Sequence, residues 1–129
     1  MILDTTFLIH LLHGDPAVKR LMSEIDETGT AYVTSISVME LWEGIHLSSA
    51  TNEEHTRTEE LLSEMHELPF DRDCGMKAGE IAADLRSRGQ PLEDPDVMIG
   101  ATGLVHDETV LTRNVEHFER INGLAVESY

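Results

Sequence analysis

Short apolar runs alternate along this chain with longer segments of helical periodicity, and this alternation limits the fold more than any other feature. The apolar runs, read as strands, fall at residues 1–4, 31–34, 66–70, 109–112 and 124–126. The predicted helices lie at residues 7–12, 16–25, 38–45, 52–66, 75–88, 95–105 and 115–121. Strands that alternate with helices form a mostly parallel sheet covered on both faces. We therefore expect an α/β protein, a three-layer α/β/α sandwich with a short sheet of four to five strands.

Two of the predicted helices carry clear start signals. In Asp15-Pro16 and again in Asp94-Pro95, a carboxylate that can cap the helix precedes a proline at the first helical position. We therefore assign Asp94 as the cap of the helix 95–105. That segment is almost wholly apolar, so we expect this helix to be buried.

The length of the chain suits one compact domain. Its 129 residues can bury a real core but are too few for two independent ones, so we expect a single domain over 1–129. Cys74 is the only cysteine, which rules out an internal disulfide and favours a reducing compartment. No basic leader opens the sequence, and no apolar run is long enough for a membrane span. We expect a cytoplasmic protein without membrane contact.

The charge of the chain is strongly negative. Asp and Glu number 25 against 9 Lys and Arg, for a net charge of −16. Such a field repels RNA at long range, so a nucleic-acid substrate would need local cations, bound metal or high salt. Many carboxylates with little lysine favour a halophilic protein of a high-salt cytoplasm. The alternative is an acidic protein that docks a basic partner.

Asp4 stands at the end of the first apolar run. In a parallel sheet this position is the carboxyl edge, where α/β proteins bind their ligands. Thr5 and Thr6 follow directly, and their hydroxyls can hydrogen-bond the carboxylate or a metal-bound water. Alternatively, Asp4 caps the helix that begins near Phe7.

Glu40 lies nearly opposite the apolar stripe of the helix 38–45, so a solvated position is its simplest interpretation. Apolar residues flank it on its own side, however, and Gly44 one turn later leaves the approach open. A further alternative is a capping box in which Glu40 closes on the backbone of Ser37. The local sequence leaves surface, cap and site open.

Asp96 lies in the first turn of the helix 95–105, where the helix dipole favours a carboxylate whatever its function. It shares a helix face with Gly100 and Gly103. A smooth, glycine-lined surface below Asp96 would suit close packing against the first strand.

Asn114 follows the fourth predicted strand, and with Thr112 and Arg113 it forms another polar cluster at a strand end. Asn114 can equally well cap the helix 115–121, and the two roles can coexist. Three acids and an amide suit Mg²⁺, which prefers oxygen ligands, takes one or two carboxylates and keeps several waters. A cation there would acidify water and offset the charge on an attacked phosphodiester.

The chain resembles PIN-domain nucleases, and specifically the VapC toxins of toxin–antitoxin pairs, over essentially its full length. Four segments carry the resemblance: MILDTTFLI, VMELWEG, RGQPLEDPDVMIGAT and LTRNVEHFERINGL. The last two, in this order and at this spacing from Asp4, are the more specific. Gly100 stands where the family usually has alanine, and Thr6 where Asn or Ser is common, but neither difference removes a ligand.

The resemblance implies a PIN-like fold in which Asp4, Glu40 and Asp96 bind Mg²⁺ or Mn²⁺, with Asn114 as a fourth catalytic position. It further implies cleavage of single-stranded RNA, a homodimer, and a cognate antitoxin, basic or amphipathic, that blocks the site. Contacts to the ligands or to phosphate are expected from Thr5, Thr6, Asp94, Thr112 and Arg113.

Other readings of the acids fit less well. A haloacid-dehalogenase-like phosphatase needs a second Asp where this chain has Thr6, and a response-regulator receiver needs a later lysine, but none follows Lys77. Among the seven histidines only His10 and His13 are closely spaced, too few for zinc. Two alternatives stay open: a PIN nuclease of RNA processing, and a non-catalytic acidic binding module for a basic partner. The module predicts that metal and the Asp4 side chain are dispensable.

Overall fold

The five strands of the computed structural model, which describes residues 1–129, form one sheet. Their order is β3-β2-β1-β4-β5, and every neighbouring pair is parallel. The strands are β1 (Ile2–Leu3), β2 (Tyr32–Thr34), β3 (His66–Leu68), β4 (Val110–Leu111) and β5 (Val126–Glu127). The predicted short sheet is confirmed, and it is parallel throughout.

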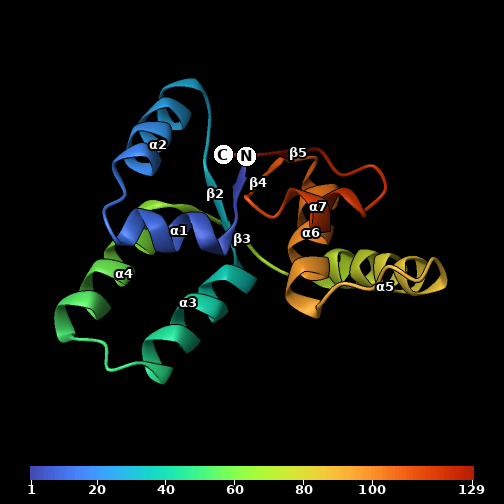
Figure 1. Cartoon of the computed structure of the whole chain (residues 1–129), viewed down its shortest axis with the longest axis horizontal. Helices are drawn as coiled ribbons and strands as arrows, with labels where there is room; N and C mark the ends of the chain where they lie inside the picture. The colour runs from blue at the N-terminus through green and yellow to red at the C-terminus, as the bar shows by residue number, and fades with distance from the viewer.

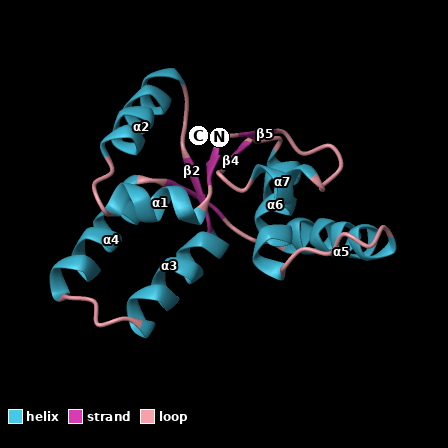
Figure 2. Ribbon diagram, viewed as in Figure 1, coloured by secondary structure: helices cyan, strands magenta, loops and turns pink.

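Seven helices surround this sheet (Figure 1). They are α1 (Thr5–Leu12), α2 (Pro16–Thr28), α3 (Ser35–Leu47), α4 (Asn52–Glu64), α5 (Arg72–Ser87), α6 (Asp94–His106) and α7 (Val115–Glu119). Figure 2 shows α1, α2 and α4 on one side of the strands and α5, α6 and α7 on the other. Helix α3 contacts both α1 and α6. None of the helices has the length and apolar character that a membrane crossing requires.

Each helical layer covers its own core. Successive side chains of a strand point to opposite faces, so Ile2 and Val110 pack under α5, α6 and α7, while Leu3 and Leu111 pack under α1 and α2. All four are at most 2% exposed. Because the central strands are covered on both faces, they read in the sequence as continuous apolar runs. The predicted three-layer sandwich is therefore confirmed.

The direction in which strands are added reverses next to β1. The chain first adds β2 and β3 on one side of β1, and then crosses over to add β4 and β5 on the other side. In parallel α/β sheets, ligands bind beyond the carboxyl ends of the strands at such a reversal. Asp4 follows β1 and Thr112 follows β4, so both residues lie at this point of the fold.

One helix cap is as predicted and another is not. Asp15 caps α2 by accepting hydrogen bonds from the backbone N–H groups of Ala17 and Val18. Helix α6, in contrast, already begins at Asp94, and Glu93 in the N-cap position makes no side-chain cap hydrogen bond. The prediction that Asp94 caps this helix is wrong, because the backbone becomes helical one residue earlier than the proline signal indicated.

The two glycines of α6 allow close packing, but against a different segment from the one expected. A Cβ atom at Gly100 would overlap Cδ1 of Ile121, and one at Gly103 would lie 2.9 Å from Cδ1 of Leu124 and 3.1 Å from the carbonyl oxygen of Glu108. These neighbours belong to the chain on either side of β4 and not to the first strand. The sequence pattern predicted a close approach correctly and its partner wrongly.

Candidate active site

Asp4 is almost buried, with 7% of its surface exposed, directly beyond the end of β1. Its Oδ1 accepts a hydrogen bond of 2.8 Å from the backbone N–H of Thr5, and its Oδ2 accepts one of 2.7 Å from the hydroxyl of Thr112. Burial raises the pKa of Asp4; the two hydrogen bonds oppose this rise, and the charge of Asp96 adds to it. Asp4 occupies the N-cap position of α1, so the predicted cap is confirmed, and the nearby charge of Asp96 leaves the predicted site role open beside it.

Glu40 joins this site from α3. Its Oε1 accepts a hydrogen bond of 2.7 Å from the hydroxyl of Thr5, whose Oγ1 also lies 2.8 Å from Oγ of Ser37. Burial raises the pKa of Glu40, the hydrogen bond from Thr5 lowers it, and the charges of Asp4 and Asp96 raise it further. The Thr5–Ser37 contact thus ties α1 to α3 beside the two carboxylates.

The structure excludes two of the alternatives that the sequence left open for Glu40, the capping box and the freely solvated position. Thr34 caps α3, because its hydroxyl accepts a hydrogen bond of 3.2 Å from the backbone N–H of Ser37. The helix therefore begins at Ser35, and the capping box between Ser37 and Glu40 does not form. Glu40 is half-buried and hydrogen-bonded to another helix, so it is not a freely solvated surface residue either.

Asp96 lies in the first turn of α6 with its side chain 26% exposed. Its negative charge raises the pKa of both Asp4 and Glu40, which shows that the three acids interact although they come from three different segments. Oδ2 of Asp96 also lies 3.3 Å from Nδ1 of His117. The acids predicted from the sequence are therefore brought together at the edge of the sheet.

Asn114 occupies the N-cap position of α7, but its side chain makes no cap hydrogen bond. Its amide nitrogen instead lies 2.6 Å from Nδ1 of His117, and its backbone N–H donates a 2.9 Å hydrogen bond to Thr112 Oγ1. His117 was missed by the sequence reasoning. Its spacing of three residues from Asn114, which puts both on one helix face, was the available signal.

Two residues expected to contact the site do not reach it. Thr6 is exposed and its side chain makes no hydrogen bond, because one step along a helix turns it away from the face that Thr5 presents. Asp94 is exposed as well, since the step of two positions from Asp94 to Asp96 corresponds to about half a helical turn. Thr5 and Thr112, in contrast, both hydrogen-bond the acids.

Arg113 does not touch the carboxylates. Its guanidinium lies over the ring of Tyr129, 4.8 Å from the ring centroid, and forms no salt bridge. Burial raises the pKa of Tyr129, the charge of Arg113 lowers it and the charge of Asp4 raises it, so this pair lies close to the acids. Arg88, another cation near the site in sequence, is held by Asp84 at 2.8 Å.

The acidic residues have the donor chemistry of a divalent-cation site. Burial raises the pKa of Asp4 and Glu40, and no lysine or arginine lowers it in compensation. Carboxylates withdrawn from water without a countercharge are unfavourable, and a hard cation with oxygen ligands would offset this. No three acidic, histidine or cysteine side chains close around one point. Mg²⁺ does not need them to, since it takes one or two carboxylates and keeps several waters.

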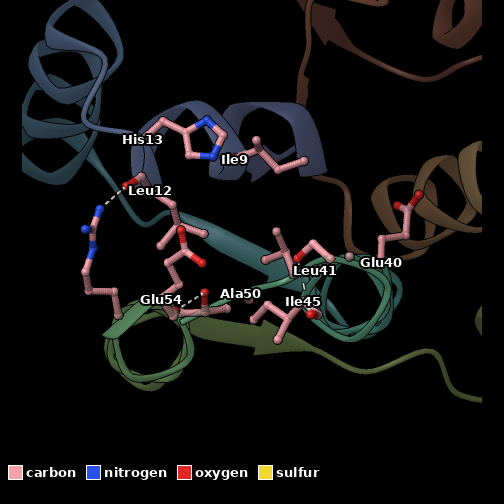
Figure 3. A pocket seen from close by; sticks show the side chains of 12 residues that line it. Ile9, Leu12, His13, Glu40, Leu41, Ile45, Ala50 and Glu54 are labelled. Carbon is pink, nitrogen blue, oxygen red and sulfur yellow. Dashed lines mark hydrogen bonds between the residues drawn. The ribbon is translucent and has the colours of Figure 1, made fainter. Parts of the chain in front are cut away.

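A pocket of about 300 Å³ lies beside the site between α1, α3 and α4. Its lining includes Ile9, Leu41 and Ile45, with Glu40 at its edge. Figure 3 shows the carboxylate of Glu40 pointing away from the pocket. Arg57 also lines the pocket, and its guanidinium donates a 2.6 Å hydrogen bond to the carbonyl oxygen of Leu12. This pocket is a partly apolar groove that leads up to the acidic site, and we call it the groove between α1, α3 and α4.

Comparisons with known proteins agree with this geometry. The PIN domain family model matches residues 1–124. The tRNA(fMet)-specific endonuclease VapC of Salmonella typhimurium is 31% identical, with 98% of this chain and 96% of that protein aligned. Ribonuclease VapC19 of Mycobacterium tuberculosis is also 31% identical, over 91% of this chain and 90% of its own.

Two solved structures have closely similar folds. VapBC2 from Rickettsia felis, bound to a DNA fragment from its promoter, matches 99% of this chain and 97% of its own with a TM-score of 0.91 and 22% identity. DNA-bound VapBC from Salmonella typhimurium matches 98% of this chain and 96% of its own, with a TM-score of 0.89 and 28% identity. The resemblance seen in the sequence is confirmed: this chain belongs to the PIN-domain family, in its VapC branch.

Proposed function

We propose that this chain is a divalent-cation-dependent endoribonuclease that acts as the toxin of a toxin–antitoxin pair. One observation carries the proposal: the buried carboxylate of Asp4 and the half-buried one of Glu40 interact with a third, Asp96, and have no countercharge. The relatives named above are ribonucleases, which makes RNA the substrate class to test first. The acids stand where the sheet reverses, at the place where this class of fold binds ligands.

In this proposal Asp4, Glu40 and Asp96 form the site for Mg²⁺, with Mn²⁺ as the alternative; one or two of the carboxylates would bind the cation directly and the others through the waters that it keeps. The bound cation would supply a water of lowered pKa as the nucleophile and offset the charge that develops on the attacked phosphodiester. Asn114 adds an amide beside Asp96 through their common neighbour His117. The protein's part in the reaction would be to hold these groups close to one phosphate of the RNA.

The surrounding hydroxyls position the acids. Thr112 and the backbone N–H of Thr5 each bind one oxygen of Asp4, so the carboxylate plane is held from both sides. The hydroxyl of Thr5 binds Glu40 and is itself in contact with Ser37. Because these hydroxyls are buried, the carboxylates keep their orientation when no cation is bound.

Arg113 is the side chain best placed to meet a phosphate or a base of single-stranded RNA. It is exposed and free of salt bridges, and it lies over Tyr129 close to Asp4. An arginine stacked on an aromatic ring offers both a charge for phosphate and a flat surface for a base. With a net charge of −16, the rest of the chain repels RNA, so we expect binding to require salt or divalent cations.

We further propose a basic or amphipathic antitoxin as protein partner. The related solved structures are VapBC complexes, and another is described as a toxin–antitoxin complex from Klebsiella pneumoniae. A basic partner would complement the acidic surface. The groove between α1, α3 and α4 ends at Glu40, so a segment seated in it would reach the active site. A homodimer remains part of the proposal, and sizing in solution tests it.

The test is cleavage of a mixed single-stranded RNA pool at high salt with Mg²⁺ or Mn²⁺. Asp96→Asn keeps the shape of the side chain and removes its charge, and Asp94→Asn is the matched control two residues away on the exposed side of the helix. We expect cleavage by the wild type and by Asp94→Asn, and none by Asp96→Asn or after EDTA treatment. Circular dichroism establishes that each variant is folded.

Either of two results would contradict the proposal. If folded Asp96→Asn cleaves RNA at the wild-type rate, the acids are not the catalytic site. If no protein cleaves RNA but a basic partner binds with or without metal, the chain is an acidic binding module. Arrest of cell growth by the chain, relieved when a small antitoxin encoded directly upstream is co-expressed, would separate a toxin from an RNA-processing nuclease.

A further inference from the structure

An imidazole stands next to the carboxylates. Nδ1 of His117, on α7, lies 3.3 Å from Oδ2 of Asp96 and 2.6 Å from Nδ2 of Asn114. The histidine side chain is 42% exposed, so part of the ring is open to solvent. The side chains of Asp96 and His117 make no hydrogen bonds other than these two contacts.

The two atoms that face each other, Oδ2 of Asp96 and Nδ1 of His117, are both of a kind that binds cations. If the amide nitrogen of Asn114 donates to Nδ1, this nitrogen has its lone pair free and no proton to give to Asp96. A carboxylate oxygen and a ring nitrogen then lie 3.3 Å apart without a proton between them. Two ligands at right angles on one cation, with bonds of roughly 2.1 Å, would be about 3 Å apart. The pair is therefore spaced like neighbouring ligands of one cation.

We propose that His117 binds the divalent cation through Nδ1, next to Asp96. This inference rests on the proposed metal site and extends it by one ligand. A cation entering between the two side chains takes the place of the Asn114 contact at Nδ1, which frees the Asn114 amide to turn its oxygen toward the site.

A nitrogen ligand changes which cation the site prefers. Mg²⁺ selects oxygen ligands and gives up its waters reluctantly, whereas Mn²⁺, the first and weakest member of the first-row transition-metal series, accepts a nitrogen ligand more readily than Mg²⁺ does. With His117 as a ligand, the site binds Mn²⁺ more tightly than its carboxylates alone would, while Mg²⁺ gains little. The proposal therefore predicts a preference for Mn²⁺ that depends on this one side chain.

The test is pulsed electron paramagnetic resonance of the wild-type protein loaded with one equivalent of Mn²⁺, which detects nitrogen bound to the metal. We expect an imidazole nitrogen coupling in the wild type and in His66→Gln, a control at the exposed outer strand β3. His117→Gln should lose the coupling. Its affinity for Mn²⁺ should fall by about tenfold, on the scale seen when groups supporting a metal site are removed, with a much smaller change for Mg²⁺.

The outcomes separate this proposal from the proposed function. If the wild type binds Mn²⁺ and Asp96→Asn abolishes that binding, but no nitrogen coupling is seen, His117 is an ion-pair partner of Asp96 and the ligand proposal is overturned alone. If His117→Gln keeps both the coupling and the Mn²⁺ preference, the proposal is overturned in the same way. If the wild type does not bind Mn²⁺ or Mg²⁺ at all, both proposals fall.

Discussion

Replacing Thr112 with valine tests how the site is held together. Thr112 is fully buried, its hydroxyl donates to Asp4 at 2.7 Å, and its Oγ1 accepts from the backbone N–H of Asn114 at 2.9 Å. Valine has nearly the same shape, so Thr112→Val removes both hydrogen bonds without opening a cavity. The only change is that a buried carboxylate loses a donor and a backbone N–H loses its acceptor.

The expected loss follows from these two bonds. A hydrogen bond to a charged group contributes about 1.5–3 kcal/mol, and an unsatisfied, partly buried N–H adds about 1 kcal/mol, so Thr112→Val should cost roughly 2–4 kcal/mol. For a chain of this length the melting temperature should fall by roughly 4 °C per kcal/mol. The loss should be smaller at pH values below the raised pKa of Asp4, where its carboxyl group is neutral.

Urea unfolding of the cation-free wild type and Thr112→Val proteins at several pH values measures this loss of stability. Thr112→Ser is the control, because it keeps the hydroxyl and loses only a buried methyl group, worth about 1 kcal/mol. Since the Thr112 bond lowers the pKa of Asp4, Thr112→Val should also move the rise of RNA cleavage to higher pH. A Thr112→Val protein as stable as the wild type, or more stable than Thr112→Ser, would refute the reasoning.

Three further predictions concern the charge of the site, the charge of the whole chain and the packing of α6. Glu40 has a raised pKa, so its ionised form destabilises the fold above that pKa. Without divalent cations, Glu40→Gln should match the stability of the wild type below the ordinary pKa of a glutamate and exceed it by a margin that grows as the pH rises through the raised pKa, in urea unfolding; equal stability at all pH values would count against this. With a net charge of −16, the melting temperature should rise as KCl is added, and a flat salt dependence would exclude adaptation to high salt. Gly103→Ala should lower the free energy of unfolding by about 1–3 kcal/mol through overpacking. Gly79→Ala is the control: its Cβ would meet nothing within 4 Å, so it should raise the free energy of unfolding by up to about 1 kcal/mol. Similar effects of both substitutions would disprove the packing account.

Much of the fold could be predicted because it rests on local pattern. The apolar run before Asp4 and the one before Thr112 are buried strands, and the Asp15-Pro16 signal starts a helix as predicted. These features depend on residues a few positions apart. The same kind of signal failed at Asp94, because a carboxylate and a proline at a helix start are compatible with two neighbouring cap positions.

The site was less accessible from the sequence. Glu40 could not be told from a surface or capping residue, since its role depends on Thr5, which is 35 residues away and on another helix. His117 gave only a weak local signal, because its contact with Asp96 spans 21 residues and two helices. Side chains that meet across such distances leave no periodicity in the chain.

The sequence by itself determined which segments form strands and helices, because the periods of 2 and 3.6 residues record the faces that each segment buries. It also placed Asp4 at a strand end. Only the tertiary structure decided that the chain crosses back past β1 to add β4, and this crossover brings Thr112 to Asp4 across 108 residues. Strand order depends on how whole layers pack, and a pattern confined to neighbouring residues does not record it.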